Sequence, residues 1–258
     1  MYSINIQGFL MDFSTAKVMG ILNLTPDSFY DGGTYSSDAK VLKQVEKMLH
    51  EGADILDLGA FSSRPNAELI SEEEEQKRLL PTLQKIVEEF PYAILSVDTY
   101  RSSIAQMVVQ EGAHIINDIS GGLFDPEMIR SVGEMKVPYV LMHMQGEPSS
   151  MQRNPSYEDV FKEIFSFFSE QIHALQQHGV HDIILDPGFG FGKSLEHNYE
   201  LLKKLSYFHA LERPLLAGIS RKGMIQKLIE EEAKDALNGT TAAHAIALLN
   251  GANILRVH

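Results

Sequence analysis

The segment Val18–Leu24, with the sequence VMGILNL, is a short apolar run. An amphipathic helical stretch, Asp38–His50, and a second apolar run, Ile55–Gly59 (ILDLG), follow it. Short runs rich in apolar and β-branched residues are typical of buried strands, and apolar residues spaced by three and four are typical of helices. Strands that alternate with helices along a chain pair in parallel. This part of the sequence therefore predicts a strand–helix–strand unit of a parallel sheet.

The same alternation continues along the rest of the chain. Further strand-like runs are Ile94–Val97, His114–Asn117, Tyr139–Met142, Ile183–Leu185, Pro214–Ala217 and Asn253–Val257. Further helical stretches are Ser71–Phe90, Arg101–Gln110, Tyr157–His178, Ser194–Leu205 and Gly239–Asn250. Ser71, with Glu74 three residues later, has the pattern of a capping box at a helix start.

The number of units decides between an open sheet and a closed one. Eight strand-like runs in 258 residues match the (β/α)₈ or TIM barrel, an α/β fold of about 250 residues. We expect a single domain over residues 1–258, with a short N-terminal hairpin at Ile4–Phe13 that plugs the bottom of the barrel. The last strand-like run ends next to His258, so the sequence given leaves no residues for a final, eighth helix.

Composition argues against several classes of function. The net charge of −13 argues against a general nucleic-acid surface, which needs clustered Lys and Arg. The chain has no cysteine, which excludes disulfides and thiolate chemistry. No apolar run is long enough for a membrane span, and the first residues do not resemble a signal peptide. We therefore expect a cytoplasmic protein that binds neither nucleic acid nor membrane.

Polar side chains occur where nearly every predicted strand ends. They are Asn23, Asp57, Asp98, Asn117, Asp118, His143, Asp186, Ser220, Arg221, Lys222, Arg256 and His258. In this fold the carboxyl ends of the strands meet at one rim, where the active site lies, whereas strand interiors are usually Val, Ile or Leu. For any one of these residues, a role in capping a neighbouring helix is a competing explanation. The whole set nevertheless indicates an active site.

The acceptors at this rim suggest one part of a ligand. Asp98, Asn117 and Asp186 offer carboxylate and amide oxygens. A carboxylate can accept two parallel hydrogen bonds from adjacent N–H groups. These residues therefore suit a flat heterocycle with an amidine-like edge.

The donors at the rim suggest the other part. Lys222, Arg256 and His258 suit a ring carbonyl and a phosphate or pyrophosphate group. Asn23 offers a neutral oxygen of the kind that Mg²⁺ accepts when phosphates and waters supply its other ligands. The sequence has neither a Ser-His-Asp arrangement nor an HExxH motif. The pattern thus indicates binding and leaving-group stabilisation rather than covalent catalysis.

Two glycine-bearing segments accompany the rim. The segment GFGFGK, Gly188–Lys193, lacks the spacing of a nucleotide-binding P-loop. We interpret it as a tight turn that lets the backbone approach a ligand, with Phe191 as an aromatic wall. The segment Asp31–Gly33 belongs to a long loop after the first strand, a candidate lid.

Taken together, the strand-end motifs resemble those of the dihydropteroate synthase family over the whole length of the chain. The matching segments are MGILNLTPDSFYDGG (Met19–Gly33), SSRPNA (Ser62–Ala67), SVDTYR (Ser96–Arg101), INDISGG (Ile116–Gly122), LMHMQG (Leu141–Gly146), LDPGFGFGK (Leu185–Lys193), SRK (Ser220–Lys222) and RVH (Arg256–His258). Each motif is short, but they occur in the right order, one for each strand end, and the set is specific.

The resemblance implies a reaction of folate biosynthesis. In it, p-aminobenzoate condenses with 7,8-dihydropterin-6-ylmethyl diphosphate, which gives dihydropteroate and pyrophosphate. It implies dissociative substitution, in which Mg²⁺ assists the departure of pyrophosphate before the arylamine attacks. It also implies a homodimer whose surface involves late helices, and a target of sulfonamides.

The resemblance also implies roles for individual residues. The residues of the pterin pocket would be Asp98, Asn117, Asp186 and Lys222, with Met142 and Gly190 also in the substrate-binding set. Arg256 would stack on the pterin and touch the diphosphate, and His258 and Asn23 would complete the anion and Mg²⁺ site. The residues expected to act directly in catalysis are Asp98, Lys222, Arg256 and His258. Two loops would close over pyrophosphate and form the p-aminobenzoate pocket with Phe191 and Lys222, and their members are Asp27, Ser28, Phe29, Ser63, Arg64 and Pro65.

The chain departs from the family pattern at two places. Many relatives have Gly-Glu-Ser-Thr-Arg-Pro-Gly in the second loop, where this chain has Ala60-Phe61-Ser62-Ser63-Arg64-Pro65-Asn66. Some relatives place a Ser that meets the p-aminobenzoate carboxylate where this chain has Gly223. Two alternatives stay open: a pterin-binding methyltransferase acting on methyltetrahydrofolate, and a catalytically inactive barrel subunit.

Overall fold

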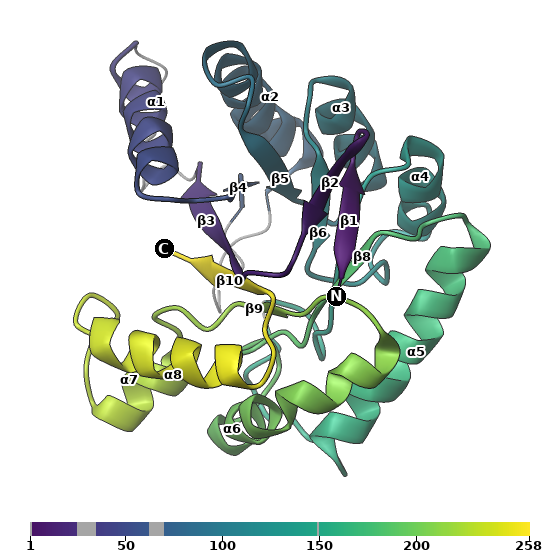
Figure 1. Cartoon of the computed structure of the whole chain (residues 1–258), viewed down its shortest axis with the longest axis vertical. Coiled ribbons are helices and arrows are strands. Elements are labelled where there is room, and N and C mark those ends of the chain that lie inside the picture. Colours follow the sequence, from purple (N-terminus) through teal and green to yellow (C-terminus); the bar gives the residue numbers. More distant parts are fainter. Residues whose placement is uncertain (1, 25–34, 62–69, 149) are drawn as a thin grey trace.

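The structure, a computed structural model, describes residues 2–24, 35–61, 70–148 and 150–258, in which helices surround a ring of parallel strands (Figure 1). The strands are β3 (Lys17–Asn23), β4 (Ile55–Gly59), β5 (Ile94–Asp98), β6 (Ile115–Asp118), β7 (Tyr139–Met142), β8 (Ile183–Asp186), β9 (Leu216–Ala217) and β10 (Ile254–Val257). Their order is β8-β7-β6-β5-β4-β3-β10-β9. A parallel bridge between Leu185 and Leu215 joins β8 to the residue before β9 and closes the ring. The predicted α/β barrel is confirmed.

The helices follow the strands around the outside of the barrel. They are α1 (Tyr35–His50), α2 (Glu72–Glu89), α3 (Ser102–Gln110), α4 (Met128–Met135), α5 (Val160–Gln177), α6 (Leu195–Lys204) with the 3₁₀ helix η1 (Leu205–Leu211), α7 (Gly223–Ile229) and α8 (Leu237–Leu249). The sequence analysis predicted neither α4 nor α7. Both α7 and α8 lie between β9 and β10, and no described residue forms a helix after β10, as expected.

The capping box predicted at the start of α2 forms only in part. The Ser71 side chain accepts a hydrogen bond from the backbone N–H of Glu74 at 3.2 Å. The Glu74 carboxylate instead accepts from Nε of Arg78 at 2.7 Å, one helical turn further on. A complete capping box occurs at α6, where Ser194 and His197 satisfy each other's backbone N–H groups.

The N-terminal hairpin closes the bottom of the barrel, as predicted. Strands β1 (Ser3–Ile6) and β2 (Phe9–Asp12) pair antiparallel. Their buried apolar side chains pack against the first inward residue of nearly every barrel strand, and this cluster contains Ile4, Ile6, Met11, Phe13, Met19, Ile55, Ile115, Val140, Ile184, Leu216 and Ile254. Burial of this apolar layer stabilises the barrel at the end opposite the candidate site.

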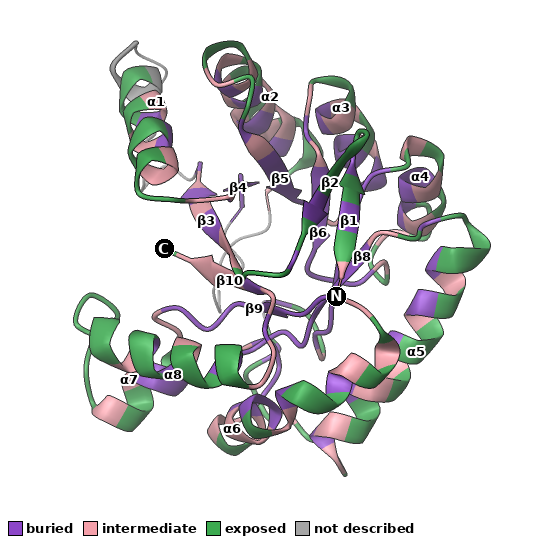
Figure 2. Cartoon of the chain, in the orientation of Figure 1, coloured by how far each residue is buried: buried purple, intermediate pink, exposed green. Residues whose placement is uncertain are grey.

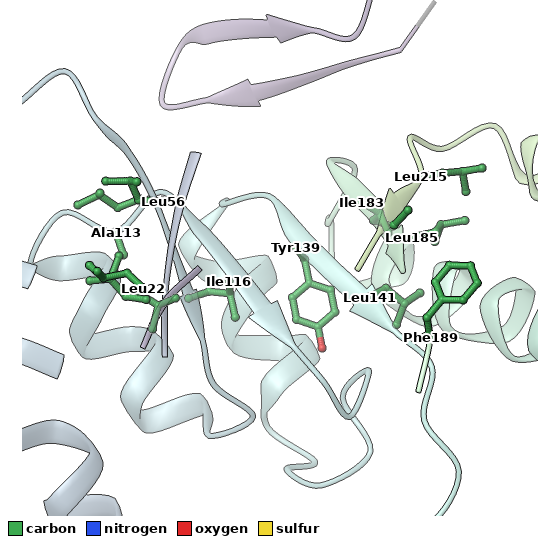
Figure 3. Packing of buried hydrophobic residues seen from close by; sticks show 14 of the residues in the cluster. Leu22, Leu56, Ala113, Ile116, Tyr139, Leu141, Ile183, Leu185, Phe189 and Leu215 are labelled. Atoms are coloured by element: carbon green, nitrogen blue, oxygen red, sulfur yellow. The ribbon is translucent and has the colours of Figure 1, made fainter. Parts of the chain in front are cut away.

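A larger apolar core lies between the strands and the helices (Figure 3). Leu56 and Leu58 of β4 are fully buried in it, and so are Leu141 of β7 and Leu185 of β8. Most helices turn an apolar stripe toward this layer, so buried and exposed surfaces alternate along them (Figure 2). An exception is α8, which also exposes large apolar side chains. In the described residues no helix combines the length and the apolar character that a bilayer span requires. The predicted cytoplasmic location stays a prediction.

The alternation of side chains along the strands places the polar residues inside the ring. Successive strand residues point to opposite faces. In β4, Leu56 and Leu58 belong to the outer core, so Ile55, Asp57 and Gly59 point inward. The same rule, applied to every strand, forms a polar layer above the apolar bottom layer.

Candidate active site

The polar layer opens into a cavity of about 1080 Å³ at the carboxyl end of the strands. Its lining includes the predicted site residues Asn23, Asp98, Gly190, Phe191, Lys222, Arg256 and His258. Asn117, Met142 and Asp186 are buried and lie outside this lining. The structure therefore brings to one cavity most of the predicted site residues that it describes.

Arg256 of β10 joins the carboxylates of two other strands. Its Nε donates to Oδ2 of Asp57 at 2.7 Å, and its Nη2 donates to Oδ2 of Asp98 at 3.2 Å. The Asn117 side chain donates from Nδ2 to the same Asp57 oxygen at 2.9 Å. The second oxygens of Asp57 and Asp98 are buried and have no hydrogen-bond partner among the described residues. Such orphaned acceptors are costly, so a donor supplied by a ligand would be favoured at Asp98.

Burial sets the protonation behaviour of this layer. Burial raises the pKa of the Asp98 carboxyl, and the nearby Arg256 opposes that shift. Burial likewise raises the pKa of Asp186, against the effect of Lys222. Burial lowers the pKa of Lys222 to about 8, with Asp186 acting in the opposite direction. Acidic and basic groups with shifted pKa values that lie close together are typical of a functional site.

Lys222 stands at the edge of the cavity, between the β8–α6 loop and Asp186. Its Nζ donates to the backbone oxygen of Phe189 at 2.6 Å and lies 4.5 Å from the centre of the Phe191 ring. A Cβ on Gly218 would lie 3.7 Å from both Lys222 Nζ and Asp186 Oδ2, so both groups lie close to this glycine. The structure thus places Lys222 near Asp186 and Phe191, and their roles in binding stay predictions.

A second lysine, Lys193, holds the β8–α6 loop from beneath. It is 3% exposed, and its Nζ contacts His143 Nδ1 at 3.1 Å, the His143 backbone oxygen at 3.2 Å and the Phe191 backbone oxygen at 3.0 Å. Burial and the neighbouring Lys193 lower the pKa of His143 to about 2, so its neutral ring can accept a hydrogen bond. Gly188 lets the loop approach His143, since a Cβ there would lie 1.9 Å from the His143 oxygen. These contacts fix the loop that carries Phe191.

An apolar cluster forms part of the cavity wall, to which it contributes Phe61, Met151 and Phe191. Met142 packs in it with Phe61 and Phe191, and the remaining buried members are Ile119, Met144 and Met151. The Phe61 ring makes an edge contact with the Tyr100 ring at 5.5 Å. The apolar residue that replaces the acid of many relatives therefore fits into a buried cluster instead of facing solvent.

Some rim residues have structural roles. The Asp118 carboxylate accepts hydrogen bonds from Ser120 N at 2.7 Å, Gly122 N at 2.9 Å and the Tyr139 hydroxyl at 2.7 Å. These bonds shape the β6–α4 connection. For Asp118, a structural role in a satisfied hydrogen-bond network is therefore the better explanation.

The outer part of the cavity carries His258 and Gly223. His258 Nδ1 lies 3.2 Å from Ser220 Oγ, which orients the ring beside the SRK segment. Gly223 begins α7, and nothing lies within 4 Å of the position that its Cβ would take. The cavity therefore has room for a side chain there.

Asn23 is the predicted Mg²⁺ ligand, at the end of β3 on the cavity wall. No group of three or more His, Asp or Glu side chains that could hold a metal occurs among the described residues. Mg²⁺ usually keeps several waters and binds substrate phosphates through one or two protein oxygens. A single amide oxygen in a wide cavity fits an ion that arrives with a diphosphate, and does not fit an ion held by protein alone.

Several predicted residues lie outside the described part of the chain. They are Asp27, Ser28, Phe29, Ser63, Arg64 and Pro65, together with the segment Asp31–Gly33. Their assigned roles stay predictions. Conversely, Asp57 was predicted only as a member of the strand-end set, and Lys193 only as part of the glycine-rich turn, with no contact or individual role for either.

Comparison with known proteins shows the family to which the chain belongs. The model of the family described as pterin binding enzyme matches residues 19–258, so the chain belongs to the pterin binding enzyme family. The Escherichia coli (strain K12) dihydropteroate synthase is 46% identical over 254 residues, which cover 98% of this chain and 89% of that protein. The expected resemblance to dihydropteroate synthases is confirmed.

Solved structures agree with this. A Yersinia pestis dihydropteroate synthase with a sulfonamide drug complex superimposes with a TM-score of 0.93 at 40% identity, covering 100% of this chain and 94% of that one. A Xanthomonas albilineans dihydropteroate synthase with 4-aminobenzoic acid gives a TM-score of 0.91 at 38% identity, covering 99% and 92%. These relatives favour the synthase over the methyltransferase and the inactive barrel.

Proposed function

We propose that the chain condenses p-aminobenzoate with 7,8-dihydropterin-6-ylmethyl diphosphate to give dihydropteroate and pyrophosphate. One observation carries the proposal. Asp98 lines a cavity that also carries Lys222 and His258, and Arg256 and Asp57 link Asp98 to the buried amide of Asn117. Acceptors for a heterocycle and donors for an anion thus converge on one space.

The pterin would bind at the floor of this cavity. Its N–H groups would donate to Asp98, Asn117 and Asp186, and the orphaned Asp98 Oδ1 would gain a partner. Lys222 would donate to the ring carbonyl. The Arg256 guanidinium is held in plane by two carboxylates and would lie against the pterin face.

Pyrophosphate would leave toward the outer cavity. Arg256 and His258 lie on that side and can donate to phosphate oxygens as their charge grows. Asn23 would hold Mg²⁺ together with the diphosphate, and the ion would neutralise charge on the leaving group. The carboxylates of Asp98 and Asp186 would stabilise the cationic pterin methylene left behind.

p-Aminobenzoate would bind beside Phe191 and Lys222, near the start of α7. Its amine attacks a cation, so it needs no strong base. We expect a sulfonamide to compete with p-aminobenzoate for this place.

A coupled assay tests the function. The purified chain with Mg²⁺ and both substrates should release pyrophosphate in equal amount with dihydropteroate. Ser96→Ala, a change of a buried β5 residue whose hydroxyl has no hydrogen-bond partner among the described residues, serves as the control with unchanged turnover. A folded chain that binds neither substrate and releases no pyrophosphate would refute the proposal.

We also propose a homodimer that forms through α8. This helix exposes Leu237, Ile246, Leu248 and Leu249, and Leu249 is 88% exposed. Large apolar side chains exposed on one helix are a feature of interaction surfaces. Sedimentation should give a dimer for the wild-type chain and a monomer for Leu249→Glu, whereas a monomeric wild type at micromolar concentration would contradict it.

A further inference from the structure

We propose that Asp57 is a positioning residue for pterin recognition: its carboxylate fixes the orientation of the Asn117 amide and of the Arg256 guanidinium. The inference rests on the proposed function, because it assigns a role within that same site. Asp57 does not contact substrate itself. It has no exposed surface and is absent from the cavity lining.

Burial of the Asp57 carboxylate is unfavourable for the stability of the fold. Asp57 is an inward residue of β4 with zero exposure, at a strand position where barrels usually carry Val, Ile or Leu. One of its oxygens accepts two hydrogen bonds and the other is buried without a partner. A buried carboxylate with an orphaned oxygen is poor evidence of a stabilising role, because its desolvation is only partly offset. Function is the simpler reason for its presence.

The second step concerns Asn117, whose amide could face the cavity with either end. A carboxylate can only accept, so Asp57 binds the Nδ2 end at 2.9 Å. The carbonyl end of Asn117 is then left for a ligand, and no group in the described part of the chain donates to it within hydrogen-bond distance. Asp57 therefore makes Asn117 an acceptor, the polarity that a pterin N–H group requires.

The third step concerns Arg256. Its Nε is bound to Asp57 at 2.7 Å and its Nη2 to Asp98 at 3.2 Å, so two of its three nitrogens are fixed and the guanidinium plane cannot rotate. The shorter of the two bonds goes to Asp57. Asp57 thus carries most of the pairing with Arg256, which leaves Asp98 available to the pterin.

The test is a swap of polarity between Asp57 and Asn117. Asp57→Asn can donate as well as accept, so the Asn117 amide is free to invert. We expect binding of 6-hydroxymethylpterin, measured by calorimetry, to weaken on the order of 10- to 100-fold, as loss of a charge-assisted contact implies. The KM for the pterin diphosphate should rise in parallel, while the KM for p-aminobenzoate should stay within about twofold, which a merely structural defect would not achieve.

The double variant D57N/N117D restores the pair with donor and acceptor exchanged. Asn at position 57 can donate to the new carboxylate, whose second oxygen accepts from the pterin. We expect pterin affinity to return to within about fivefold of wild type, a coupling that separate structural losses would not give. Ser96→Ala, which changes the β5 residue paired in register with Asp57, is the matched control and should bind normally.

The outcomes are distinct. If the wild-type chain does not bind the pterin, the proposed function fails. If the wild type binds and folded Asp57→Asn binds equally well, the inference about Asp57 is overturned. If Asp57→Asn does not fold, the double variant decides, and either failure to fold or failure to bind pterin in that variant would overturn the inference.

Discussion

The same strands form both ends of the barrel. Two inward-facing residues of one strand, two positions apart, belong to the apolar end and to the polar end. In β4, Ile55 packs into the apolar layer against the N-terminal hairpin, and Asp57, two residues later, lies in the polar layer. In β8, Ile184 and Asp186 show the same step. Burial of apolar side chains at one end stabilises the folded state. At the other end, desolvation of the buried charged groups destabilises the folded state, but these groups have fixed positions from which they can bind a ligand. The free energy gained at the apolar end therefore offsets the desolvation penalty at the polar end.

The largest expected effect is a loss of pterin affinity on substitution of Asp186, at the polar end of β8. Asp186 lies at the carboxyl end of β8, and its Oδ1 accepts from Gly188 N at 2.8 Å. Asp186→Asn keeps that acceptor and removes a buried charge, so we expect little loss of stability. Pterin affinity should fall on the order of 100-fold, because a charge-assisted hydrogen bond is lost. Calorimetry and thermal unfolding measure the two quantities.

Asp182 is the matched control at the other end of the same strand. It precedes β8, and its carboxylate accepts from the backbone N–H of Asn5 in the hairpin at 2.9 Å. Asp182→Asn should leave pterin affinity unchanged. Equal losses in both variants would show that the two ends are not functionally separate.

The next prediction concerns Lys193, whose hydrogen bonds at the polar end stabilise the β8–α6 loop. Lys193→Met removes the donor from three buried acceptors on His143 and Phe191. We expect the free energy of unfolding to fall by about 3 kcal/mol in urea titration, with a raised KM for p-aminobenzoate. Lys204→Met, which breaks the partly exposed α6 pair with Glu200 and a contact of Nζ with the Phe161 ring, should cost less than about 1 kcal/mol. Similar losses in both variants would contradict the support assigned to Lys193.

The strands and the rim could be predicted because they depend on local pattern. Apolar runs and the alternation rule suffice to place Asp98 and Asp186 inside the barrel. The helix α4 could not be found this way, since it has only eight residues, lacks a side-chain cap and contains Gly133. That glycine weakens the helical signal, yet the fold requires it, because a Cβ there would lie 2.1 Å from the His178 backbone oxygen.

The roles of Asp57 and Lys193 could not be predicted for a different reason. Sequence shows that Asp57 points inward, but not that Asn117 and Arg256 share one of its oxygens, because those residues are 60 and 199 positions away. Lys193 follows glycines in a segment that was compared with a phosphate loop. Two of its three acceptors belong to His143, which follows β7 and lies 50 positions away in the sequence; the pairing of β7 with β8 brings it close.

The third effect concerns the apolar end. Ile4 is 1% exposed and packs against the first layer of the barrel. Ile4→Ala should lower the free energy of unfolding by about 2–4 kcal/mol through lost burial and a cavity, with kcat and both KM values unchanged. Phe9→Ala, at a hairpin position that is 62% exposed, should change stability by less than about 0.5 kcal/mol. A loss of pterin affinity in Ile4→Ala would break the separation of the two ends.

The smallest effect is a pH dependence confined to the polar end. Burial lowers the pKa of Lys222 to about 8 in the folded chain, against about 10.4 when unfolded. The ammonium is the form that donates to the pterin, so kcat/KM should fall about tenfold for each pH unit above 8.

Stability should move in the opposite direction over the same range. Below pH 8 the lysine is protonated in both states, whereas between about 8 and 10.4 the unfolded chain binds more protons, so Lys222 makes the folded state more stable as pH rises. Lys222→Arg stays charged and should lose the fall in kcat/KM above pH 8, while Ile4→Ala should keep the wild-type profile. A wild-type profile that is flat from pH 7 to about 10 would show that the charge on Lys222 has no part in the reaction.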